Sequence, residues 1–121
     1  MSTYIIQKNN VITLNRGDSL SLPIKLYTNN SFPREDKLIL EDGDLIFFAL
    51  MEPNQKFECS VIKKEYDQSD FDSEGNLVLQ LDPLDTMGLH SGVYYYELKL
   101  LKHSDNSITT LMNKTKFNLV D

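Results

Sequence analysis

Apolar side chains occupy every second position in several stretches of this sequence, and that alternation constrains the fold more than any other feature. Between residues 18 and 27 the alternating apolar residues are Leu20, Leu22, Ile24 and Leu26. After Gly92 they are Tyr94, Tyr96, Leu98 and Leu100. Successive side chains of a β-strand point to opposite faces, so each stretch predicts a half-buried strand. Pro23 lies in the outward set and cannot donate to a neighbouring strand, which predicts an edge strand or a bulge there.

Further short apolar runs bring the expected number of strands to about seven to nine. Residues 45–50 are apolar on both faces, which is typical of a central strand with one face in the core and the other covered. The remaining expected strands span 57–62, 77–81, 108–112 and 115–120, with a first, broken strand over 4–6 and 11–14. The strands 57–62 and 77–81 are expected to form a hairpin-like pair.

Turn residues separate these runs, and only one short segment predicts a helix. Glycine occurs together with Asp, Asn or Ser at 15–18, 41–44, 72–76 and 91–92. One helical turn is expected at 83–88, with Asp82 as its N-cap and Pro83 at its first position. Parallel strands need long crossover connections, for which the chain has no room. The sequence therefore predicts an all-β, antiparallel two-sheet sandwich in a single domain, residues 1–121.

Composition excludes several classes of function. The chain carries 12 basic and 18 acidic residues, a formal net charge of −6, and so lacks the basic footprint of a nucleic-acid or anionic-membrane binder. No apolar stretch approaches the roughly 20 residues of a membrane helix, and the N-terminus lacks the pattern of a signal peptide. The single cysteine, Cys59, cannot form an internal disulfide. We therefore expect cytoplasmic synthesis and neither a nucleic-acid nor a membrane partner.

The segment that leads into the Tyr-rich strand resembles a known structural corner. A short polar stretch, 82–86, precedes the strand that begins at Gly92, and Tyr94 stands near the start of that strand. This arrangement resembles the tyrosine corner of immunoglobulin-like sandwiches, in which the tyrosine hydroxyl bonds back to backbone a few residues earlier. Tyr94 is the candidate for that structural role. The resemblance implies that the sandwich is immunoglobulin-like.

The order of turns and strands along the chain carries a wider resemblance. The segments involved are 16–20, 43–53, 75–81, the Tyr-rich strand and the stretch up to Phe117. Together they resemble the N-terminal domain of the upper baseplate proteins in tails of phages of Gram-positive bacteria, and small stand-alone relatives of it. The resemblance implies a non-enzymatic structural or assembly protein in the tail of a phage or prophage virion. Its implied partners are other tail or baseplate proteins, or further copies of the chain in a homo-oligomer.

One acidic turn is a candidate metal site. Asp70, Asp72 and Glu74 stand at alternate positions before Gly75, as at the opening of a calcium-binding loop. The twelfth position of such a loop is a glutamate, whereas here it is Leu81. A weak calcium site at these three residues therefore stands beside the alternative of an acidic turn that leads into a strand. We expect no other cofactor.

No residue pattern predicts an enzyme, and the alternative of a small hydrolase would need a pocket that holds a perturbed carboxylate or thiol. Cys59 falls within an expected strand, on one face with Phe57 and Val61, and is expected to be a small buried hydrophobic residue. The only histidines, His90 and His103, fall in expected turns. The paired carboxylates at 41–44 and 82–85 are explained by the preference of Asp for turns.

Outward-facing aromatic residues are the candidate interface. Phe47 and Tyr95 are expected on the outward sides of their strands, and together with Ala49 they define a patch for contact with another protein. A second hypothesis is a carbohydrate-binding module for a host-surface polysaccharide, with Tyr95, Tyr66 and the acidic turns as its site. In a third, the loop 28–36 simply covers the outward aromatic residues.

Overall fold

The structure, a computed structural model, describes residues 4–5, 11–29 and 36–121. Its strands are β1 (Tyr4–Ile5), β2 (Ile12–Asn15), β3 (Leu20–Ile24), β4 (Leu26–Asn29), β5 (Asp36–Lys37), β6 (Leu45–Met51), β7 (Ile62–Tyr66), β8 (Leu77–Leu81), β9 (Gly92–Lys102) and β10 (Ser107–Val120). Its helical segments are η1 (Phe57–Cys59), η2 (Gln68–Asp70) and α1 (Pro83–Met87). The predicted all-β class is confirmed, and eight of the ten strands have four or more residues.

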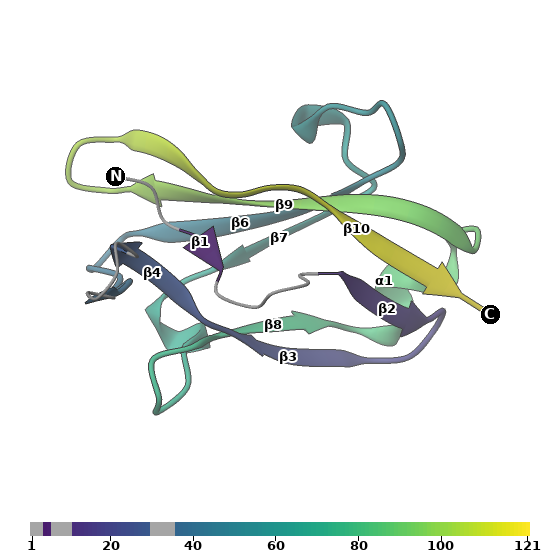
Figure 1. Ribbon diagram of the computed structural model, residues 1–121, viewed down its shortest axis with the longest axis horizontal. Coiled ribbons are helices and arrows are strands. Elements are labelled where there is room, and N and C mark those ends of the chain that lie inside the picture. The colour runs from purple at the N-terminus through teal and green to yellow at the C-terminus, as the bar shows by residue number, and fades with distance from the viewer. Residues whose placement is uncertain (1–3, 6–10, 30–35) are drawn as a thin grey trace.

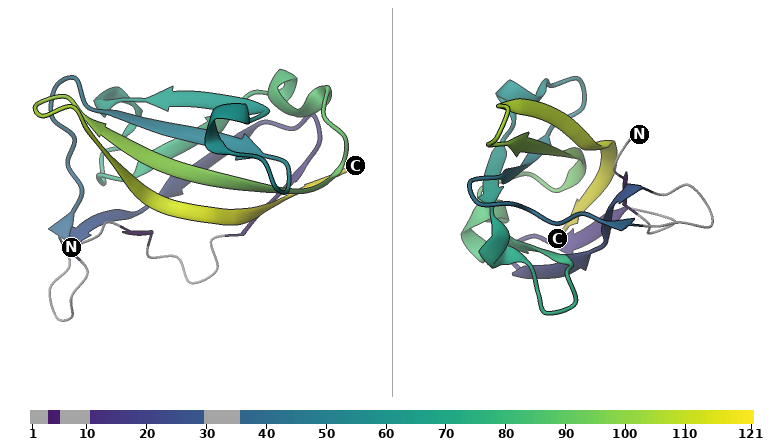
Figure 2. Two further views of the ribbon diagram at one scale, coloured as in Figure 1. Left: turned by 90° about the horizontal axis from the view of Figure 1, so that it is seen from above. Right: turned by 90° about the vertical axis from the view of Figure 1, so that its left-hand side faces the viewer.

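The strands form two facing layers (Figure 1). One layer is a five-stranded sheet in the order β2-β10-β9-β6-β7, and the opposite layer contains the β3-β8 pair. A further small sheet has the order β1-β4-β5. Figure 2 (left) shows β10, in yellow, running beside β9 over most of its length. β6 lies between β9 and β7, as predicted for a strand that is apolar on both faces.

The expectation of a wholly antiparallel fold is wrong at one place. The first expected strand is split between two sheets: β1 pairs antiparallel with β4 in the small sheet, while β2 pairs parallel with β10 in the five-stranded sheet. A parallel pair needs a long connection, and here most of the chain lies between Ile12 and its partner Phe117. The connection between the parallel strands β2 and β10 is therefore made by all the elements from β3 to β9. Ile6, the last residue of the first expected segment, lies outside the described residues.

Two further pairings differ from the sequence-based expectation. β7 and β8 do not form a hairpin with each other, since β7 pairs with β6 and β8 pairs with β3. The two strands expected in the C-terminal stretch are one bent strand, β10, whose register against β9 shifts between Thr110 and Thr115. Such shifts let a long strand bend without breaking its pairing. Pro23 lies on β3, whose only partner among the described residues is β8, as predicted for an edge strand.

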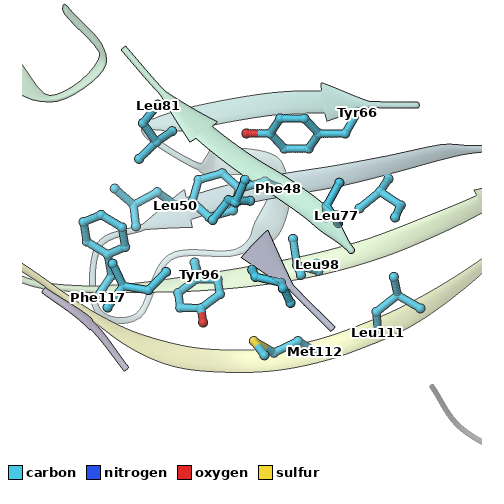
Figure 3. Packing of buried hydrophobic residues seen from close by; sticks show 14 of the residues in the cluster. Phe48, Leu50, Tyr66, Leu77, Leu81, Tyr96, Leu98, Leu111, Met112 and Phe117 are labelled. Atoms are coloured by element: carbon cyan, nitrogen blue, oxygen red, sulfur yellow. The ribbon is translucent and has the colours of Figure 1, made fainter. Parts of the chain in front are cut away.

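The inward side chains of both layers form one core (Figure 3). Its centre contains the rings of Phe48, Tyr96 and Phe117, with ring centroids 5.7 Å apart for Phe48 and Tyr96 and 6.3 Å apart for Tyr96 and Phe117. Leucines at alternate positions of β8 close the core from the opposite layer. The predicted helical turn is present as α1, and Asp82 N–H donates to Asp85 Oδ2 at 2.7 Å in a capping box.

Two core tyrosines should resist ionisation in the folded protein until well above pH 10. Burial raises the pKa of Tyr96 to about 12, and burial with nearby carboxylates raises that of Tyr66 to about 12 against the opposing hydrogen bond to Gln80. The unfolded chain ionises them near 10.0, so the stability that they contribute is complete below that pH and is lost as the pH rises towards 12. We expect an alkaline titration of phenolate absorbance to show these two ionising together with loss of the β-sheet circular dichroism. Ionisation of all six tyrosines near pH 10 with the fold intact would contradict this.

Candidate protein-contact face

The candidate site is the outer face of the five-stranded sheet, the side turned away from β3 and β8. Strand register places Leu45 of β6 and Ile108 of β10 on either side of Leu101 of β9, so these three form an apolar row. Ile108 is 64% exposed. In the next row Phe47 lies between Lys99 of β9 and Glu65 of β7. These positions alternate with the core residues of the same strands, so the strands that form the core also position the outer face.

Two of the three predicted patch residues lie at the outer surface and one does not. Phe47 and Tyr95 are half-buried on the outer face. Ala49 is 0% exposed, so the expectation that it lines an exposed patch is wrong. The segment 52–61 follows β6, and Figure 1 shows it, in teal, rising above the sheet on the side opposite β3 and β8.

Phe57 of η1 packs on the outer face of the sheet. Its ring lies 5.8 Å from Lys63 Nζ of β7 and 5.2 Å from Lys99 Nζ of β9, measured to the ring centroid. Because β6 runs between these two strands, the ring lies over the part of β6 that includes Ala49. The stretch predicted as a strand over 57–62 is thus a short helical turn that packs on the sheet. This cover comes from segment 52–61, whereas the hypothesis of a covering loop at 28–36 falls largely on residues 30–35, outside the described residues.

Segment 52–61 divides the aromatic patch into two hollows. One, of about 560 Å³, is lined by Phe47, Phe57, Lys63, Lys64 and Glu65. The other, of about 270 Å³, is lined by Pro53, Asn54, Tyr95 and Lys114. Lys114 Nζ donates to the backbone oxygen of Gln55 at 2.6 Å, which ties β10 to the segment. The outer face therefore offers two separate aromatic anchor points.

The lysines that flank Phe57 were not singled out by sequence reasoning. Lys63 Nζ donates to the backbone oxygen of Glu58 at 3.3 Å, and Lys99 Nζ donates to Thr110 Oγ1 at 3.0 Å. Neither amine has a carboxylate within 4.0 Å among the described residues. Cation–π attraction to the ring holds them in place. These lysines could have been identified only by predicting the strand order, which places β7 and β9 on either side of β6.

Tyr94 makes the hydrogen bond that defines a tyrosine corner. Its hydroxyl donates to the backbone oxygen of His90 at 2.7 Å. Burial, together with the charge of Glu52, raises the pKa of Tyr94. The contact fixes the connection between α1 and β9, and it is the bond that the resemblance to immunoglobulin-like sandwiches implies for this residue.

The structure does not assemble the candidate calcium site. Asp72 Oδ1 accepts the N–H groups of Glu74 and Asn76, both at 2.9 Å. Asp70 Oδ2 accepts the N–H of Asp67 at 2.9 Å as part of the cap of η2. Across residues 4–5, 11–29 and 36–121, no three His, Cys, Asp or Glu side chains gather where they could hold a metal ion. The acidic turn shapes the chain before β8, which is the alternative that the sequence left open.

Cys59 is exposed, and the expectation that it is buried is wrong. The alternate apolar residues at 57, 59 and 61 imitate a strand, but the backbone forms η1, in which Cys59 N–H donates to Lys56 O at 2.9 Å. His90 and His103 lie outside helices and strands, as predicted.

Asp44 is a buried carboxylate that sequence reasoning treated as an ordinary turn residue. It is 1% exposed and accepts hydrogen bonds from His103 N at 2.9 Å, Glu41 N at 3.0 Å and Lys102 Nζ at 3.2 Å. Burial alone would raise its pKa, but these donors outweigh burial and lower it. In turn, hydrogen bonds to Glu41 and Asp44 raise the pKa of Lys102. The cluster joins the turn before β6 to the β9–β10 hairpin and supports the outer face from one end.

The backbone conformation and the lack of space at position 43, next to Asp44, both require glycine. Its φ of +87° lies in the left-handed region that favours glycine. A Cβ atom at this position would come 2.7 Å from Cγ of His103. Gly43 thus allows both the turn before β6 and the close approach of His103 in the β9–β10 hairpin, whose backbone N–H donates to Asp44.

Comparison with known proteins adds no family to this description. No protein-family model matches the chain, and no curated protein matches its sequence significantly. In the part of the chain that the structure describes, no helix has the length and apolar character to cross a membrane. The fold and the face define a β-sandwich module with two aromatic hollows on one sheet.

Proposed function

We propose that this chain is a non-enzymatic structural module of a phage or prophage tail, associated with the baseplate, that binds other tail proteins through its outer face. The observation that carries the proposal is the pair of aromatic hollows at Phe47 and Tyr95 on one sheet. Aromatic side chains in partly desolvated hollows are typical anchors of protein interfaces. A contact of about 1,600 Å² in total would suffice for a stable complex. The order of turns and strands and the corner at Tyr94 supply the link to tail proteins.

Particle composition tests the proposal. Tail particles would be purified from the cells that encode this chain, and their proteins would be quantified by mass spectrometry. The proposal expects the chain in a fixed ratio to a known tail protein, retained through density-gradient purification. Particles that assemble fully without the chain would contradict it.

A charge at either anchor should weaken incorporation without unfolding the module. Phe47→Asp and Tyr95→Asp remove the aromatic ring that a partner would cover and put a charge in its place, and loss of an aromatic anchor typically costs an interface about 2 kcal/mol or more. We expect at least a tenfold loss of incorporation into particles, with melting temperatures within a few degrees of wild type. The control is Leu84→Asp on α1, since Leu84 is 81% exposed and lies outside the outer face. Normal incorporation of both anchor variants would show that another surface binds the partner.

The carbohydrate hypothesis loses one of its two aromatic residues. Tyr66 is 5% exposed, and its hydroxyl donates to the backbone oxygen of Gln80 at 2.8 Å, so the ring belongs to the core. The carboxylates of Asp70 and Asp72 accept hydrogen bonds from their own turns. The observations therefore favour protein contact.

A further inference from the structure

β7 presents an open edge of the five-stranded sheet. Among the described residues it pairs only with β6, so its other side carries unpaired backbone N–H and C=O groups. The 560 Å³ hollow is lined by Lys63, Lys64 and Glu65, three consecutive residues of this strand. Their side chains alternate between the two faces of the sheet, so a hollow that touches all three runs along the edge itself. The edge is accessible to another strand.

The charges on this edge are compensated unequally. Lys64 Nζ lies 2.9 Å from Asp85 Oδ2 of α1, on the side that faces β8. Lys63 and Glu65 point to the outer face, and neither has an oppositely charged side chain within 4.0 Å among the described residues. Charged residues usually keep an edge strand from pairing with another chain. Here Lys63 and Glu65, which form no ion pair among the described residues, flank Lys64, which is already neutralised by Asp85.

We propose that β7 pairs antiparallel with β7 of a second copy of this chain, about a two-fold axis at Lys64. In this register Lys63 of each copy stands directly opposite Glu65 of the other, so two ion pairs form across the axis. A two-fold axis at Lys63 or at Glu65 would instead place identical charges opposite each other. Of these three registers, only the one centred on Lys64 pairs the outward Lys63 and Glu65 with opposite charges. The two Lys64 side chains then face each other, but each is already paired with Asp85 of its own chain.

The pairing joins two five-stranded sheets into one continuous sheet. The strand of the second copy lies along the β7 side of the hollow, next to Lys63 and Glu65. Main-chain hydrogen bonds supply affinity, and the charge pattern supplies register and partner choice. This inference goes beyond the proposed function, because it concerns a strand edge and needs no tail protein.

Charge exchange tests the pairing on the purified chain. Sedimentation velocity over a range of concentrations should show a monomer–dimer equilibrium for wild type. Lys63→Glu or Glu65→Lys places like charges opposite each other twice per dimer, and each should weaken the dimer by about tenfold or more. The double variant Lys63→Glu/Glu65→Lys restores both ion pairs and should return the dissociation constant to within a few-fold of wild type. Lys116→Glu, at an exposed position on β10, alters the net charge by the same amount as Lys63→Glu and should leave the equilibrium unchanged.

Two results would overturn the proposal. One is a wild-type chain that stays monomeric at every concentration. The other is a double variant that dissociates as readily as the single variants, which would mean that the two residues do not face each other. Circular dichroism melts of all variants establish that dissociation does not come from unfolding. Loss of tail incorporation in Tyr95→Asp with the dimer intact would separate this edge from the face that binds a tail partner.

Discussion

Replacing Phe48 by alanine should destabilise the fold by about 3–5 kcal/mol, the usual cost of removing a buried aromatic ring. Phe48 is 0% exposed and packs against Tyr96 at the centre of the core. Domains of this size are typically stable by about 5–15 kcal/mol, so the variant should be close to unfolding at physiological temperature. Urea unfolding followed by circular dichroism would measure the change in the free energy of unfolding.

Phe57→Ala is the matched control for Phe48→Ala. The substitution is chemically the same, but Phe57 is half-buried and covers the sheet from outside. Its loss should cost roughly 1 kcal/mol, because the removed surface is partly hydrated and the space left is open to water. Equal costs for the two substitutions would mean that the core does not lie between the two layers described above.

Asp44→Ala should produce the second large effect, a loss of about 2–4 kcal/mol, because buried donors left without a partner each cost about 1–3 kcal/mol. The change removes the acceptor for two backbone N–H groups and for Lys102 Nζ. Asp42→Ala is the control, since Asp42 is an exposed acidic residue of the same turn. Chemical denaturation at neutral pH should show almost no change for Asp42→Ala, and a similar loss in both variants would refute the role assigned to the Asp44 cluster.

The contribution of Asp44 should also depend on pH in a defined direction. Its pKa in the folded protein is lowered from the ordinary value of 3.8, so the ionised form is favoured by folding. The stability that it contributes is present above the unfolded value and is lost as the pH falls through the lower folded value. The difference in stability between wild type and Asp44→Asn should therefore shrink below about pH 4. A difference that stays constant in acid would contradict the hydrogen-bonded carboxylate.

The local features of the fold could be predicted from the sequence because each depends on neighbouring residues. The alternation along β9 predicts which of its side chains point inward, because successive side chains of a strand point to opposite faces. The Asp82-Pro83 start predicts α1 in the same way. Tyr94 was found through a short corner motif, whose hydroxyl reaches a backbone oxygen four residues back.

The remaining features depend on contacts between distant parts of the chain, which leave no local pattern. Ala49 lies at an outward position of β6 by the alternation, yet it is 0% exposed on the face over which Phe57 packs between Lys63 and Lys99. Asp44 has the sequence of an ordinary turn, and its burial requires the β9–β10 hairpin. The parallel pairing of β2 joins opposite ends of the chain. The alternate apolar residues at 57, 59 and 61 predict a strand, but such a pattern also occurs by chance in a helical turn such as η1.

Site-specific photo-crosslinking from the outer face tests most directly the claim that this face binds a tail protein. A photoreactive phenylalanine analogue would replace Phe47 in one variant, Tyr95 in a second and Leu84 in a third, each incorporated into tail particles. The account expects crosslinks to another tail protein from positions 47 and 95 and none from position 84, which lies on α1. Crosslinks from position 84 alone, or from none of the three in particles that contain the chain, would contradict it.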